Sequence, residues 1–599
     1  MKELKFLFDI PLYQKEKYSL DVALSGKENI HGKKFWKNYS TDDFVSILNQ
    51  VSAGLLELGI KQGDKIALIS NNRPEWNFLD LGMQQIGAVN VPVYPTITDS
   101  EYIFIFNDAE VKLCFVSNEE LFKRVKSFQN KIPSLEKVFS FEFINEIPHW
   151  KNILKKSFAS DFEKINSVKS CIDENETATI IYTSGTTGNP KGVMLTHKNL
   201  VSNINSILQV LPLRKGARAL SFLPICHSFE RTVSYTYMAA CVSIFYAESI
   251  DTIGENIKEI KPNYFSTVPR LLEKVFEKIM QKGNSLKRIK KKLFFHALAL
   301  GEKYEINKNL GWWYNFQLSL MRKIVFSKWI EALGGEIQII VSGAAALQPK
   351  LARIFTAAGI TILEGYGLTE TSPVVCTNRL PEKERRFGTV GPALPGVEVK
   401  IAVDGEILVR GSLIMKGYYK RPDLTSEVIE TDGWFHTGDI GEFVDGRFLK
   451  ITDRKKELFK TSGGKYVAPQ TIESKFKAHP LIEQIVVIGE YRKFVSALIV
   501  PSFLNLRVWC EKNNVPTTSN SDMITNKKVF KKFQEISEEI NKDINKVEQV
   551  KKMALLANEW SLQTGELTPT LKIKRKVISE KFKNEIEKMY TEEKKMEFA

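Results

Sequence analysis

The spacing of apolar residues predicts alternating helices and strands near the start of the chain. Residues 41–60 open with Thr-Asp-Asp and then place apolar side chains at helical intervals, as an amphipathic helix with a capped start does. Residues 64–70 are a short apolar run bounded by polar residues, which is typical of a buried strand. This alternation indicates an α/β protein.

The same alternation returns in three later segments, at residues 178–188, 337–347 and 360–370. In each one, an apolar strand leads into a loop of small residues. Parallel strands bring such loops together at their carboxyl ends, which is where α/β proteins bind ligands. We therefore predict an α/β fold with a large N-terminal domain of mostly parallel sheets and a site at these loops.

The pattern changes near residue 395. Residues 397–411 and 483–501 each show two alternating runs around a turn, as β-hairpins do. The chain between them, residues 451–466, is polar and charged with paired glycines, and we predict a linker there. The predicted organisation is a large domain over residues 1–452, a hinge at 453–456 and a smaller, mobile α+β domain over 457–599.

Residues 270–333 differ from the rest of the large domain, because they indicate helices rich in Lys and aromatic residues. A basic amphipathic helix with Trp and Phe can lie on an anionic membrane, where each Lys adds about 1 kcal/mol. The alternative is a solvated helical subdomain whose aromatic side chains lie in its own core. Both interpretations of this helical basic insert stay open at the level of sequence.

Composition narrows the class of protein. The 599 residues are 43% hydrophobic, which is globular rather than disordered or collagen-like. The chain lacks an apolar run of about 18 residues and its start lacks the apolar core of a signal peptide, so neither a membrane span nor secretion is expected. Six scattered cysteines without a CxxC pair indicate neither a zinc site nor a disulfide framework. We expect a cytoplasmic protein, with the insert as its candidate for peripheral contact with the cytoplasmic face of a membrane.

The net charge is +15, from 85 Lys and Arg against 70 Asp and Glu. This balance favours anionic partners such as nucleotides, CoA or acidic lipid, although a lysine-rich base composition explains it as well. The basic runs match no nucleic-acid-binding module, so no nucleic-acid partner is expected. Nothing in the sequence indicates an oligomeric state.

Residues 182–193, YTSGTTGNPKGV, carry the first chemical signal. A strand leads into a loop where glycines let backbone N–H groups approach phosphate oxygens, hydroxyls add donors and a lysine adds positive charge. A flexible surface turn is the alternative. The spacing GxxxxGK[ST] is absent, so this is not a Walker loop. The residues predicted to bind the phosphates of ATP are Thr183, Ser184, Gly185, Thr186, Thr187, Gly188 and Lys191.

This motif resembles the signature of the adenylate-forming superfamily, which contains acyl-CoA synthetases, the adenylation domains of peptide synthetases and luciferases. Further segments match the family's motifs in the family's order. The HSFER form and the long helical insert most resemble the long-chain fatty acid–CoA ligase branch. The matching segments are LPICHSFER (223–231), SGAAAL (342–347), EGYGLTE (364–370), WFHTGD (434–439), DRKKELFKTSGGKYV (453–467) and LTPTLKIKR (567–575).

The resemblance implies that residues 364–370 contact adenine and the α-phosphate. Tyr366 stacks on adenine, as aromatic rings do on bases. Thr369 gives its hydroxyl to the α-phosphate, and Glu370 pairs with Thr183 around Mg²⁺, which prefers hard oxygen ligands. The family often has Gly beside adenine where this chain has Ala344. The implied ATP-binding set of this part is Ala344, Glu364, Gly365, Tyr366, Gly367 and Thr369.

The resemblance implies that Asp439 accepts hydrogen bonds from two ribose hydroxyls and that Arg454 is a second ribose contact. A capping or turn Asp is the alternative. Lys456 and Lys460 are carried over as nucleotide contacts, although a solvated basic linker explains them nearly as well. His227 borders the acyl and CoA pockets in the family, and a purely structural His is the alternative there.

Lys572 is the predicted adenylation lysine. Attack of a carboxylate on the α-phosphate builds negative charge on phosphate oxygens, and a lysine held in a closing cleft stabilises that charge. Charge alone does not distinguish Lys572 from its neighbours Lys574, Arg575 and Lys576, but the family register Lys-Ile-x-Arg selects Lys572. The family's Gly before this lysine is Leu571 here. The predicted catalytic set is Lys572, Thr369, Glu370 and His227.

The resemblance implies a ligase that uses ATP, Mg²⁺ and CoA. A fatty acid and MgATP give acyl-AMP and pyrophosphate; the small domain then turns, the loop at Gly463 and Gly464 replaces Lys572, and the CoA thiol takes the acyl group. The nearest alternatives are a medium-chain or aryl acid–CoA ligase and a fatty acyl-AMP ligase that loads a carrier protein. A further alternative is a membrane-associated binding protein with a dead site, against which the intact set of site residues argues.

Overall fold

The computed structural model describes residues 4–30, 32–155, 159–183, 189–249, 251–568 and 571–591. The chain divides into two compact units. The large unit comprises Met1–Lys400, Leu408–His436 and Val444–Leu449, and the small unit comprises Ile401–Ile407, Thr437–Phe443 and Lys450–Ala599. The hydrophobic clusters of the described residues each belong to one unit, so each unit has a core of its own.

The longest sheet of the large unit has a parallel centre of short, almost fully buried strands, as expected for strands with both faces covered. In its register Ser342 lies beside Glu364, and Thr267 lies beside Ser342. Antiparallel strands close both edges. The order is β14 (Val374–Thr377), β13 (Thr361–Gly367), β12 (Ile339–Ser342), β11 (Tyr264–Thr267), β9 (Arg218–Ser221), β10 (Ser243–Tyr246), β1 (Leu24–Ile30) and β2 (Lys33–Tyr39).

The second sheet of the large unit holds the strands on either side of the predicted phosphate loop. Its parallel part ends at β7, which pairs in antiparallel fashion with β8 and sets Thr183 directly opposite Lys191. The order is β17 (Gly417–Tyr418), β8 (Lys191–Thr196), β7 (Thr177–Thr183), β4 (Val89–Val93), β3 (Lys65–Ile69), β5 (Val111–Val116) and β6 (Lys137–Ser140). The two sheets confirm the predicted α/β class with mostly parallel strands.

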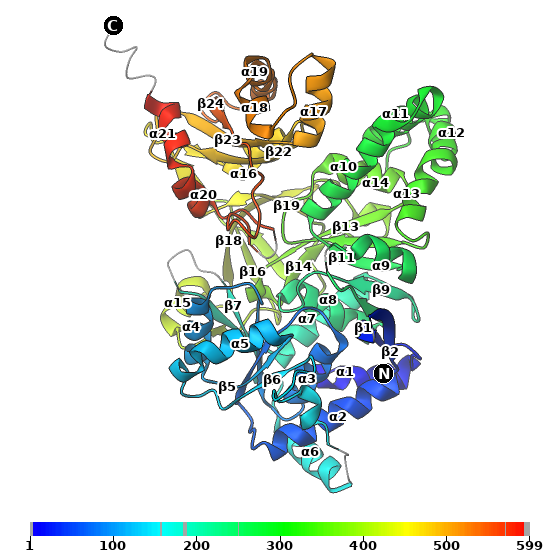
Figure 1. The fold of residues 1–599 in the computed structure, drawn as a ribbon, viewed down its shortest axis with the longest axis vertical. Helices are drawn as coiled ribbons and strands as arrows, with labels where there is room; N and C mark the ends of the chain where they lie inside the picture. Colours follow the sequence, from blue (N-terminus) through cyan, green and yellow to red (C-terminus); the bar gives the residue numbers. More distant parts are fainter. Residues whose placement is uncertain are drawn as a thin grey trace. The chain divides into compact units, whose positions relative to one another are not determined.

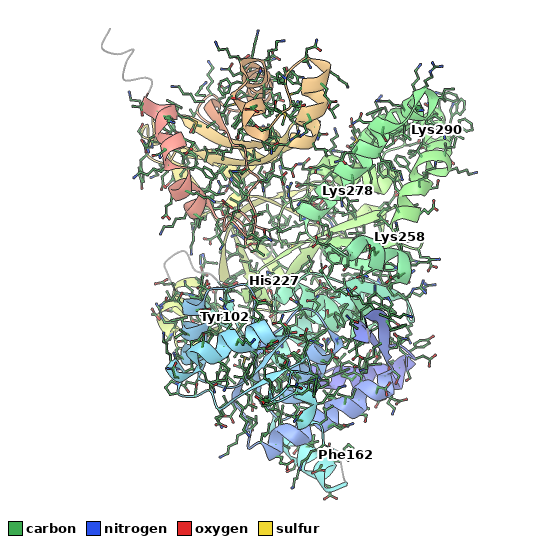
Figure 2. The ribbon with its side chains drawn as sticks, in the orientation of Figure 1. Tyr102, Phe162, His227, Lys258, Lys278 and Lys290 are labelled. Carbon is green, nitrogen blue, oxygen red and sulfur yellow. The ribbon has the colours of Figure 1, made fainter. Side chains whose placement is uncertain are left out.

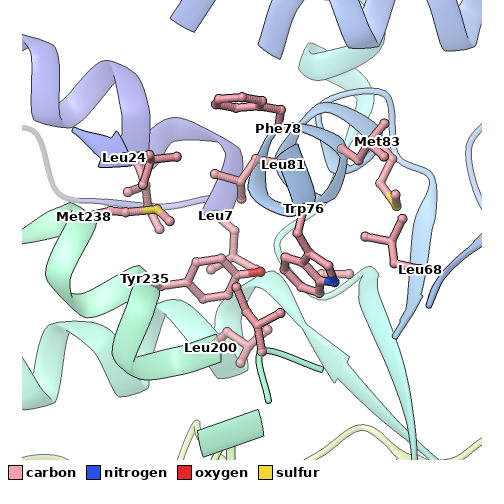
Figure 3. Packing of buried hydrophobic residues seen from close by; sticks show 14 of the residues in the cluster. Leu7, Leu24, Leu68, Trp76, Phe78, Leu81, Met83, Leu200, Tyr235 and Met238 are labelled. Carbon is pink, nitrogen blue, oxygen red and sulfur yellow. The ribbon is translucent and has the colours of Figure 1, made fainter. Parts of the chain in front are cut away.

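Helices α3 (Pro74–Gln84) and α8 (Ser228–Ala239) lie in the core that the two sheets share. Figure 3 shows Trp76 of α3 beside Tyr235 of α8, in an apolar cluster that also contains Met238 of α8. Both helices are buried along their whole length. Helix α8 begins directly after His227, so the core positions one of the predicted site residues.

A buried ionic network connects α8 to helix α3 and to strand β7. The Arg231 guanidinium donates to Thr179 Oγ1 at 2.7 Å, to Tyr235 Oη at 2.7 Å and to Asp80 Oδ1. A fully buried charge is tolerated only with partners of this kind. Because Thr179 belongs to β7, the network fixes α8 relative to the strand that leads into the predicted phosphate loop.

Local sequence sets the start of the helix predicted over residues 41–60. Ser40 Oγ accepts from the Asp43 N–H at 3.0 Å, and the Asp43 carboxylate accepts from the Ser40 N–H at 2.9 Å. This reciprocal capping box begins α2 (Thr41–Glu57), as predicted. The strand predicted over residues 64–70 is also confirmed, as β3.

A helical arm, residues 269–332, stands away from the sheets of the large unit (Figure 1). Its aromatic residues divide between interior and solvent: Phe326 and Trp329 are buried, whereas Trp312 and Trp313 are exposed. In the part of the chain that the structure describes, no helix is long and apolar enough to span a bilayer. The arm consists of α10 (Pro269–Ser285), α11 (Arg288–Lys303), α12 (Trp312–Met321), the π-helical turn η4 (Arg322–Phe326) and α13 (Ser327–Ala332).

The other helices of the large unit surround its sheets. They are α1 (Ile10–Tyr18), α4 (Asp99–Ala109), α5 (Glu119–Phe128), α6 (Ala159–Cys171), α7 (His197–Val210), α9 (Ile253–Ile260), α14 (Pro349–Ala357) and α15 (Pro422–Val428), with 3₁₀ turns η1 (Leu7–Asp9), η2 (Gln129–Lys131), η3 (Trp150–Ile153), η5 (Thr369–Thr371) and η6 (Glu382–Glu384).

Both hairpins predicted from alternating runs are present. The first belongs to a four-stranded sheet in the order β15 (Glu398–Ile401), β16 (Glu406–Arg410), β18 (Phe435–Val444) and β19 (Phe448–Arg454). The second belongs to the small unit, whose sheet has the order β22 (Ile482–Ile488), β23 (Val495–Pro501) and β24 (Val550–Leu555). The helices of the small unit are α16 (Pro469–Lys477), α17 (Phe503–Lys512), α18 (Asn520–Thr525), α19 (Lys527–Asn541), α20 (Arg575–Lys581) and α21 (Lys583–Thr591).

The segment 451–466 is more regular than the linker that its polar sequence predicts. It begins as the end of β19 and continues as the paired strands β20 (Phe459–Lys460) and β21 (Tyr466–Val467). Asp453 is buried, and its carboxylate accepts from the backbone N–H groups of Arg454 at 2.7 Å and Gln470 at 3.2 Å. Burial raises the pKa of Asp453 to about 6. The hinge at 453–456 stays a prediction. Its first residue, Asp453, is buried and accepts hydrogen bonds from the backbone.

Candidate nucleotide and acyl-transfer site

The loops after β9, β12 and β13 share one edge of the parallel sheet, because these strands run side by side in the same direction. At this edge Ser228 Oγ lies 3.2 Å from Thr369 Oγ1, which ties the start of α8 to η5. The Phe229 ring packs against Gly343, where a Cβ would come within 3.0 Å of the ring. The fold thus brings together residues that are more than 100 positions apart in sequence.

Tyr366 lies on the part of β13 that continues beyond its parallel neighbours. It pairs with Cys376 of β14, and the register shifts between Tyr366 and Gly367. Gly367 is required by close approach, because a Cβ there would lie 1.6 Å from the Pro373 carbonyl oxygen. Gly365 is less constrained, since a Cβ there would meet the Cys376 carbonyl oxygen at an ordinary 3.5 Å.

Glu364 of the predicted ATP-binding set is buried inside the large unit. The backbone N–H groups of Leu347 and Gly388 donate to its carboxyl group, and burial raises its pKa to about 8. Glu364 therefore holds the end of the loop that contains Ala344. The carboxyl group of Glu364 thus orients backbone, and its contact with ATP stays a prediction.

Ala344, where the family often has Gly, adopts the left-handed conformation with φ +68°. For an L-residue this conformation costs roughly 1–2 kcal/mol, and glycine adopts it freely. The departure from the family pattern is therefore a matter of backbone strain. Its single methyl group leaves Ala344 half-buried at the edge of the sheet.

Four residues gather where β7, β8 and β17 meet η5. Lys191 Nζ lies 5.1 Å from the centre of the Tyr418 ring, and Thr183 faces Lys191 across the β7–β8 pair. Tyr418 Oη donates to Glu370 Oε1 at 3.0 Å. Burial, followed by the nearby Glu370 carboxylate, raises the pKa of Tyr418 well above its usual value, so the phenol stays a donor. The five loop residues Ser184, Gly185, Thr186, Thr187 and Gly188 lie outside the described residues.

Tyr418 was not predicted from the sequence. Its local signal is the Gly-Tyr-Tyr-Lys-Arg-Pro run before α15, in which Gly417 has φ +143° and fits against Thr425. Such a run predicts a turn before a Pro-started helix and says nothing of a carboxylate 48 positions away. The contact depends on β17 joining the edge of the second sheet.

The residues at this edge fit a magnesium ion that arrives with a nucleotide. Mg²⁺ is usually bound through one or two carboxylates together with substrate phosphates and water. Glu370 supplies a carboxylate oriented by Tyr418, and Thr183 ends the strand that leads into the predicted phosphate loop. Within the described ranges, no group of three or more His, Cys, Asp or Glu side chains forms a cage for a metal. The donor set therefore suits a metal held mainly by the substrate.

His227 caps α8 as the residue before its first turn. Its Nδ1 accepts from the Phe229 N–H at 3.1 Å, so the ring is assigned with the proton on Nε2 in its neutral form. One ring nitrogen of His227 thus caps the helix, and its part in the reaction stays a prediction. His227 directly precedes Ser228, whose hydroxyl lies 3.2 Å from that of Thr369, the predicted α-phosphate contact. Figure 2 labels His227 in the large unit.

The small unit carries the predicted ribose residues as a pair. Arg454 Nε lies 3.4 Å from Asp439 Oδ1, and Asp439 is buried. The Asp439 N–H donates to Thr437 Oγ1 at 3.1 Å, and Glu406 Oε1 accepts from the Gly438 N–H at 2.9 Å. A buried carboxylate with a guanidinium beside it can accept hydroxyls and donate to them, as ribose recognition requires.

The other predicted residues of the hinge region lie at the surface of the small unit. Lys456 is exposed, and Lys460 is exposed with Nζ 4.7 Å from the centre of the Tyr466 ring. Gly463 and Gly464 form the tip between β20 and β21, with φ +71° at Gly464. This exposed tip is where only glycine turns without strain.

Lys572 lies in a small hairpin of the small unit. The Thr568 N–H donates to the Lys572 carbonyl at 2.8 Å, and the Lys572 N–H donates to Thr568 Oγ1 at 3.0 Å. Leu571, in place of the family's Gly, has φ +60° and packs against the core of the small unit. Both the N–H and the carbonyl of Lys572 are therefore held by hydrogen bonds to Thr568. The strained conformation of Leu571 is offset in part by its apolar contact with the core.

Arg575, three residues later, anchors this hairpin to the rest of the small unit. Its guanidinium donates twice to Glu473, at 2.7 and 2.6 Å, and once to Glu457 at 2.9 Å. Glu457 directly follows the predicted hinge. Sequence reasoning treated Arg575 only as a neighbouring positive charge, because its partners are 102 and 118 positions away.

Comparison with known proteins gives the family. The family model described as AMP-binding enzyme matches residues 16–419, and the model described as AMP-binding enzyme C-terminal domain matches residues 457–594. The long-chain-fatty-acid–CoA ligase FadD15 of Mycobacterium tuberculosis is 34% identical over 567 residues, which are 93% of each chain. The long-chain-fatty-acid–CoA ligase 6 of Homo sapiens is 32% identical over 90% of this chain and 81% of its own.

Solved structures agree with the fold. The adenylation domain of a carboxylate reductase from Mycobacterium chelonae superposes with a TM-score of 0.75 at 20% identity, covering 98% of this chain and 92% of that one. A fatty acyl CoA synthetase of Mycobacterium tuberculosis gives 0.61 at 21% identity, covering 96% and 98%. These likenesses speak for the fold alone. With the family matches over nearly the whole chain, the protein belongs to the AMP-binding enzyme family of ATP-dependent, adenylate-forming enzymes, in its long-chain fatty acid–CoA ligase branch.

Proposed function

We propose that this chain is a long-chain fatty acid–CoA ligase, which joins a fatty acid to CoA through an acyl-AMP intermediate at the expense of ATP. The observation that carries the proposal is the cluster at the sheet edge, where Tyr418 orients Glu370 beside Lys191 and Thr369 lies against the start of α8. The names of the curated relatives support the choice of a long-chain acid and of CoA as acceptor.

In the first step a carboxylate oxygen of the fatty acid attacks the α-phosphorus of ATP. A new C–O–P link forms, the bond between the α-phosphorus and the bridging oxygen breaks, and pyrophosphate leaves with the electron pair. Lys191 and Lys572 neutralise the charge on phosphate oxygens, and Thr369 donates a hydrogen bond to them. Such stabilisation of charge is the main task of a protein in these transfers. Mg²⁺, when bound with ATP, withdraws charge from the phosphates, and Glu370 with Thr183 would hold it.

In the second step the sulfur of CoA attacks the acyl carbon of acyl-AMP. The carbon–oxygen bond to AMP breaks, AMP leaves, and the thiol proton passes to solvent. We propose that the small unit turns about residues 453–456 between the steps, so that Gly463 and Gly464 replace Lys572. Tyr366 would hold adenine, and Asp439 with Arg454 would hold ribose through both steps.

The variant Lys572→Ala tests the assignment of the adenylation lysine. We expect acid-dependent exchange between ATP and pyrophosphate to fall by about 100-fold or more, because a charge that acts mainly in the transition state is lost. Formation of acyl-CoA from supplied acyl-AMP should continue. The matched control is Lys574→Ala, which removes an exposed charge two residues away. Loss of both half-reactions, or of neither, would contradict the role of Lys572.

Release of AMP across acids from acetate to oleate, with and without CoA, tests the substrate and the acceptor. We expect release to require both a long-chain acid and CoA. Exchange of pyrophosphate without any response to CoA would instead indicate a fatty acyl-AMP ligase that loads a carrier protein. A maximum at medium-chain or aryl acids would overturn the long-chain assignment.

We further propose that the chain makes peripheral contact with an anionic membrane. Long-chain fatty acids partition into bilayers, since each buried methylene contributes about 0.8 kcal/mol. A ligase for such acids gains access to substrate at a membrane surface.

A further inference from the structure

The helical arm exposes a continuous apolar surface to solvent. From Trp312 onward its members recur every three or four positions along α12 and η4, which places them on one side of the helix. Trp312 is 77% exposed, and the Trp313 ring stacks on Phe316 with centres 5.7 Å apart. Exposed apolar groups that gather in this way mark a site of interaction. We define the aromatic face as Leu310, Trp312, Trp313, Phe316, Leu320 and Ile324.

The other side of the same helix is packed into the arm, so the aromatic face is held rigidly. Leu318 and Met321 are buried against α11 and its neighbours. Tyr314 Oη donates to the Leu300 carbonyl at 2.8 Å, and the His296 ring lies 2.9 Å from Gln317 Oε1. The tryptophans are therefore exposed because the interior of the arm is already filled.

The arm that carries the aromatic face is rich in positive charge. Residues 282–328 contain eleven Lys and Arg but only two Glu. Both glutamates pair with basic residues outside the segment: Glu302 with Lys350 at 2.8 Å and Glu305 with Arg353 at 2.7 Å. Residues 282–328 therefore carry a large excess of positive charge. Figure 2 labels Lys278 and Lys290 on α10 and α11 of the arm.

We propose that the aromatic face inserts into the headgroup region of an anionic bilayer, with lysines of the arm on the lipid phosphates. Trp sits best at the boundary of water and lipid, because its ring is apolar and its N–H is polar. Lysines beside an apolar face extend their charge to the anionic surface. A protein partner fits less well, since Lys is depleted from the buried centres of protein interfaces.

This inference rests on the proposed function, because a ligase for long-chain acids is the enzyme that gains from a bilayer. It adds which surface docks and what that surface recognises. The arm belongs to the large unit, as do the sheet edge and its Thr369. Docking through the arm therefore anchors the unit that binds the acid and ATP.

Sedimentation of the full chain with vesicles tests the inference. The wild type should bind vesicles that contain phosphatidylglycerol and should not bind vesicles of pure phosphatidylcholine. Replacing Lys287, Lys290 and Lys292 by Gln should weaken binding about 100-fold, at about 1 kcal/mol for each charge. Replacing Trp312, Trp313 and Phe316 by Gln should weaken binding at least about tenfold, because apolar insertion is lost. At about 1 M salt, where charges are screened within about 3 Å, only the aromatic-face contribution should remain.

Two control variants match these changes elsewhere on the surface. Lys512, Lys531 and Lys546 changed to Gln remove three exposed charges of the small unit, and Phe143→Gln removes an exposed aromatic residue outside the arm. Both should bind like the wild type. Equal vesicle binding by the arm variants and the wild type would overturn the inference. It would also be overturned if the wild type formed a dimer in the absence of lipid and the aromatic-face variant were monomeric.

Activity separates this inference from the proposed function. With a soluble medium-chain acid and no vesicles, the arm variants should turn over like the wild type. With oleate presented in phosphatidylglycerol vesicles, they should lose activity in proportion to the binding that they lose. A wild type inactive with every acid but still bound to vesicles would overturn the function alone, and unchanged activity with vesicle-borne oleate would overturn the docking.

Discussion

At the scale of single residues, the site combines strained and oriented groups. Ala344 and Leu571 both take positive φ, at +68° and +60°, where the family pattern has Gly. Each costs roughly 1–2 kcal/mol in backbone conformation. Leu571 regains part of this through its contacts with the small-unit core, whereas Ala344 gains only a methyl group. Such strain at a proposed site persists because the surrounding contacts hold it.

Tyr418 orients the proposed metal ligand, and the variant Tyr418→Phe tests this. It keeps the ring beside Lys191 but removes the hydroxyl that donates to Glu370. We expect the Mg²⁺ concentration for half-maximal pyrophosphate exchange to rise by about tenfold, since partners of a metal ligand contribute effects of this size. The control is Tyr419→Phe, whose ring lies beside Lys420. An unchanged Mg²⁺ dependence would show that the hydroxyl has a structural role only.

At the scale of elements, a buried carboxyl joins α8 to two strands of the parallel sheet. Glu230 of α8 accepts from Ser221 of β9 at 2.6 Å and also from Ser266 of β11. Burial raises the pKa of Glu230 from 4.5 to about 7, and in the described part of the chain no cation is paired with it. The folded state therefore holds this proton more tightly than the unfolded state does.

The pH dependence of stability follows from that difference. Between pH 4.5 and about 7 the unfolded state has lost the Glu230 proton while the folded state keeps it, so stability falls as pH rises through this range. The contribution is constant above pH 7 and absent below 4.5. The variant Glu230→Gln should unfold at a higher temperature than the wild type at pH 8, by about 2 °C or more, and show a smaller difference at pH 5.

The matched control for this prediction is Glu538→Gln, an exposed carboxyl on α19. Its difference from the wild type should not change with pH. Parallel pH profiles of Glu230→Gln and the wild type in scanning calorimetry would contradict the assignment of the slope to Glu230.

Elements with a clear period could be predicted from the sequence. The helix at α2 and the hairpins β15–β16 and β22–β23 follow from apolar spacing, because their pattern is written in adjacent residues. The strands within 451–466 could not be, since Asp453 is held by the backbone of Gln470, 17 positions away. The polar sequence of this segment predicts a linker, because the burial of Asp453 depends on residues outside the segment.

At the scale of the whole molecule, the chain is two units with separate cores. The small-unit cluster contains residues 459–590 only, and the clusters of the large unit contain none of them. The two units should therefore unfold independently, as separate cooperative units of one chain do.

The variant Leu498→Ala, in the fully buried centre of the small-unit core, tests this independence. It should lower the free energy of unfolding of the small unit by about 2–5 kcal/mol, through lost burial and a cavity. In hydrogen exchange of the full chain, amides of β22 and β23 should exchange faster while those of β3 and β4 stay unchanged. Leu68→Ala in the large unit should give the converse. Equal acceleration of both units by either variant would show that they unfold together.

The sequence by itself determined the α/β class, the order of the motifs and the chemical groups of the site. These are local properties: the period of apolar residues, a loop of glycines and hydroxyls, a lysine in a fixed register. The family matches over nearly the whole chain agree with that reading.

Only the tertiary structure decided which groups meet and which face solvent. Tyr418 finds Glu370 because β17 joins the edge of the second sheet, and Arg575 finds Glu473 because α20 packs near α16. The tryptophans of α12 are exposed because other residues fill the arm. The physical reason is shared: periodicity is encoded in neighbours, whereas contact and burial depend on how distant segments pack.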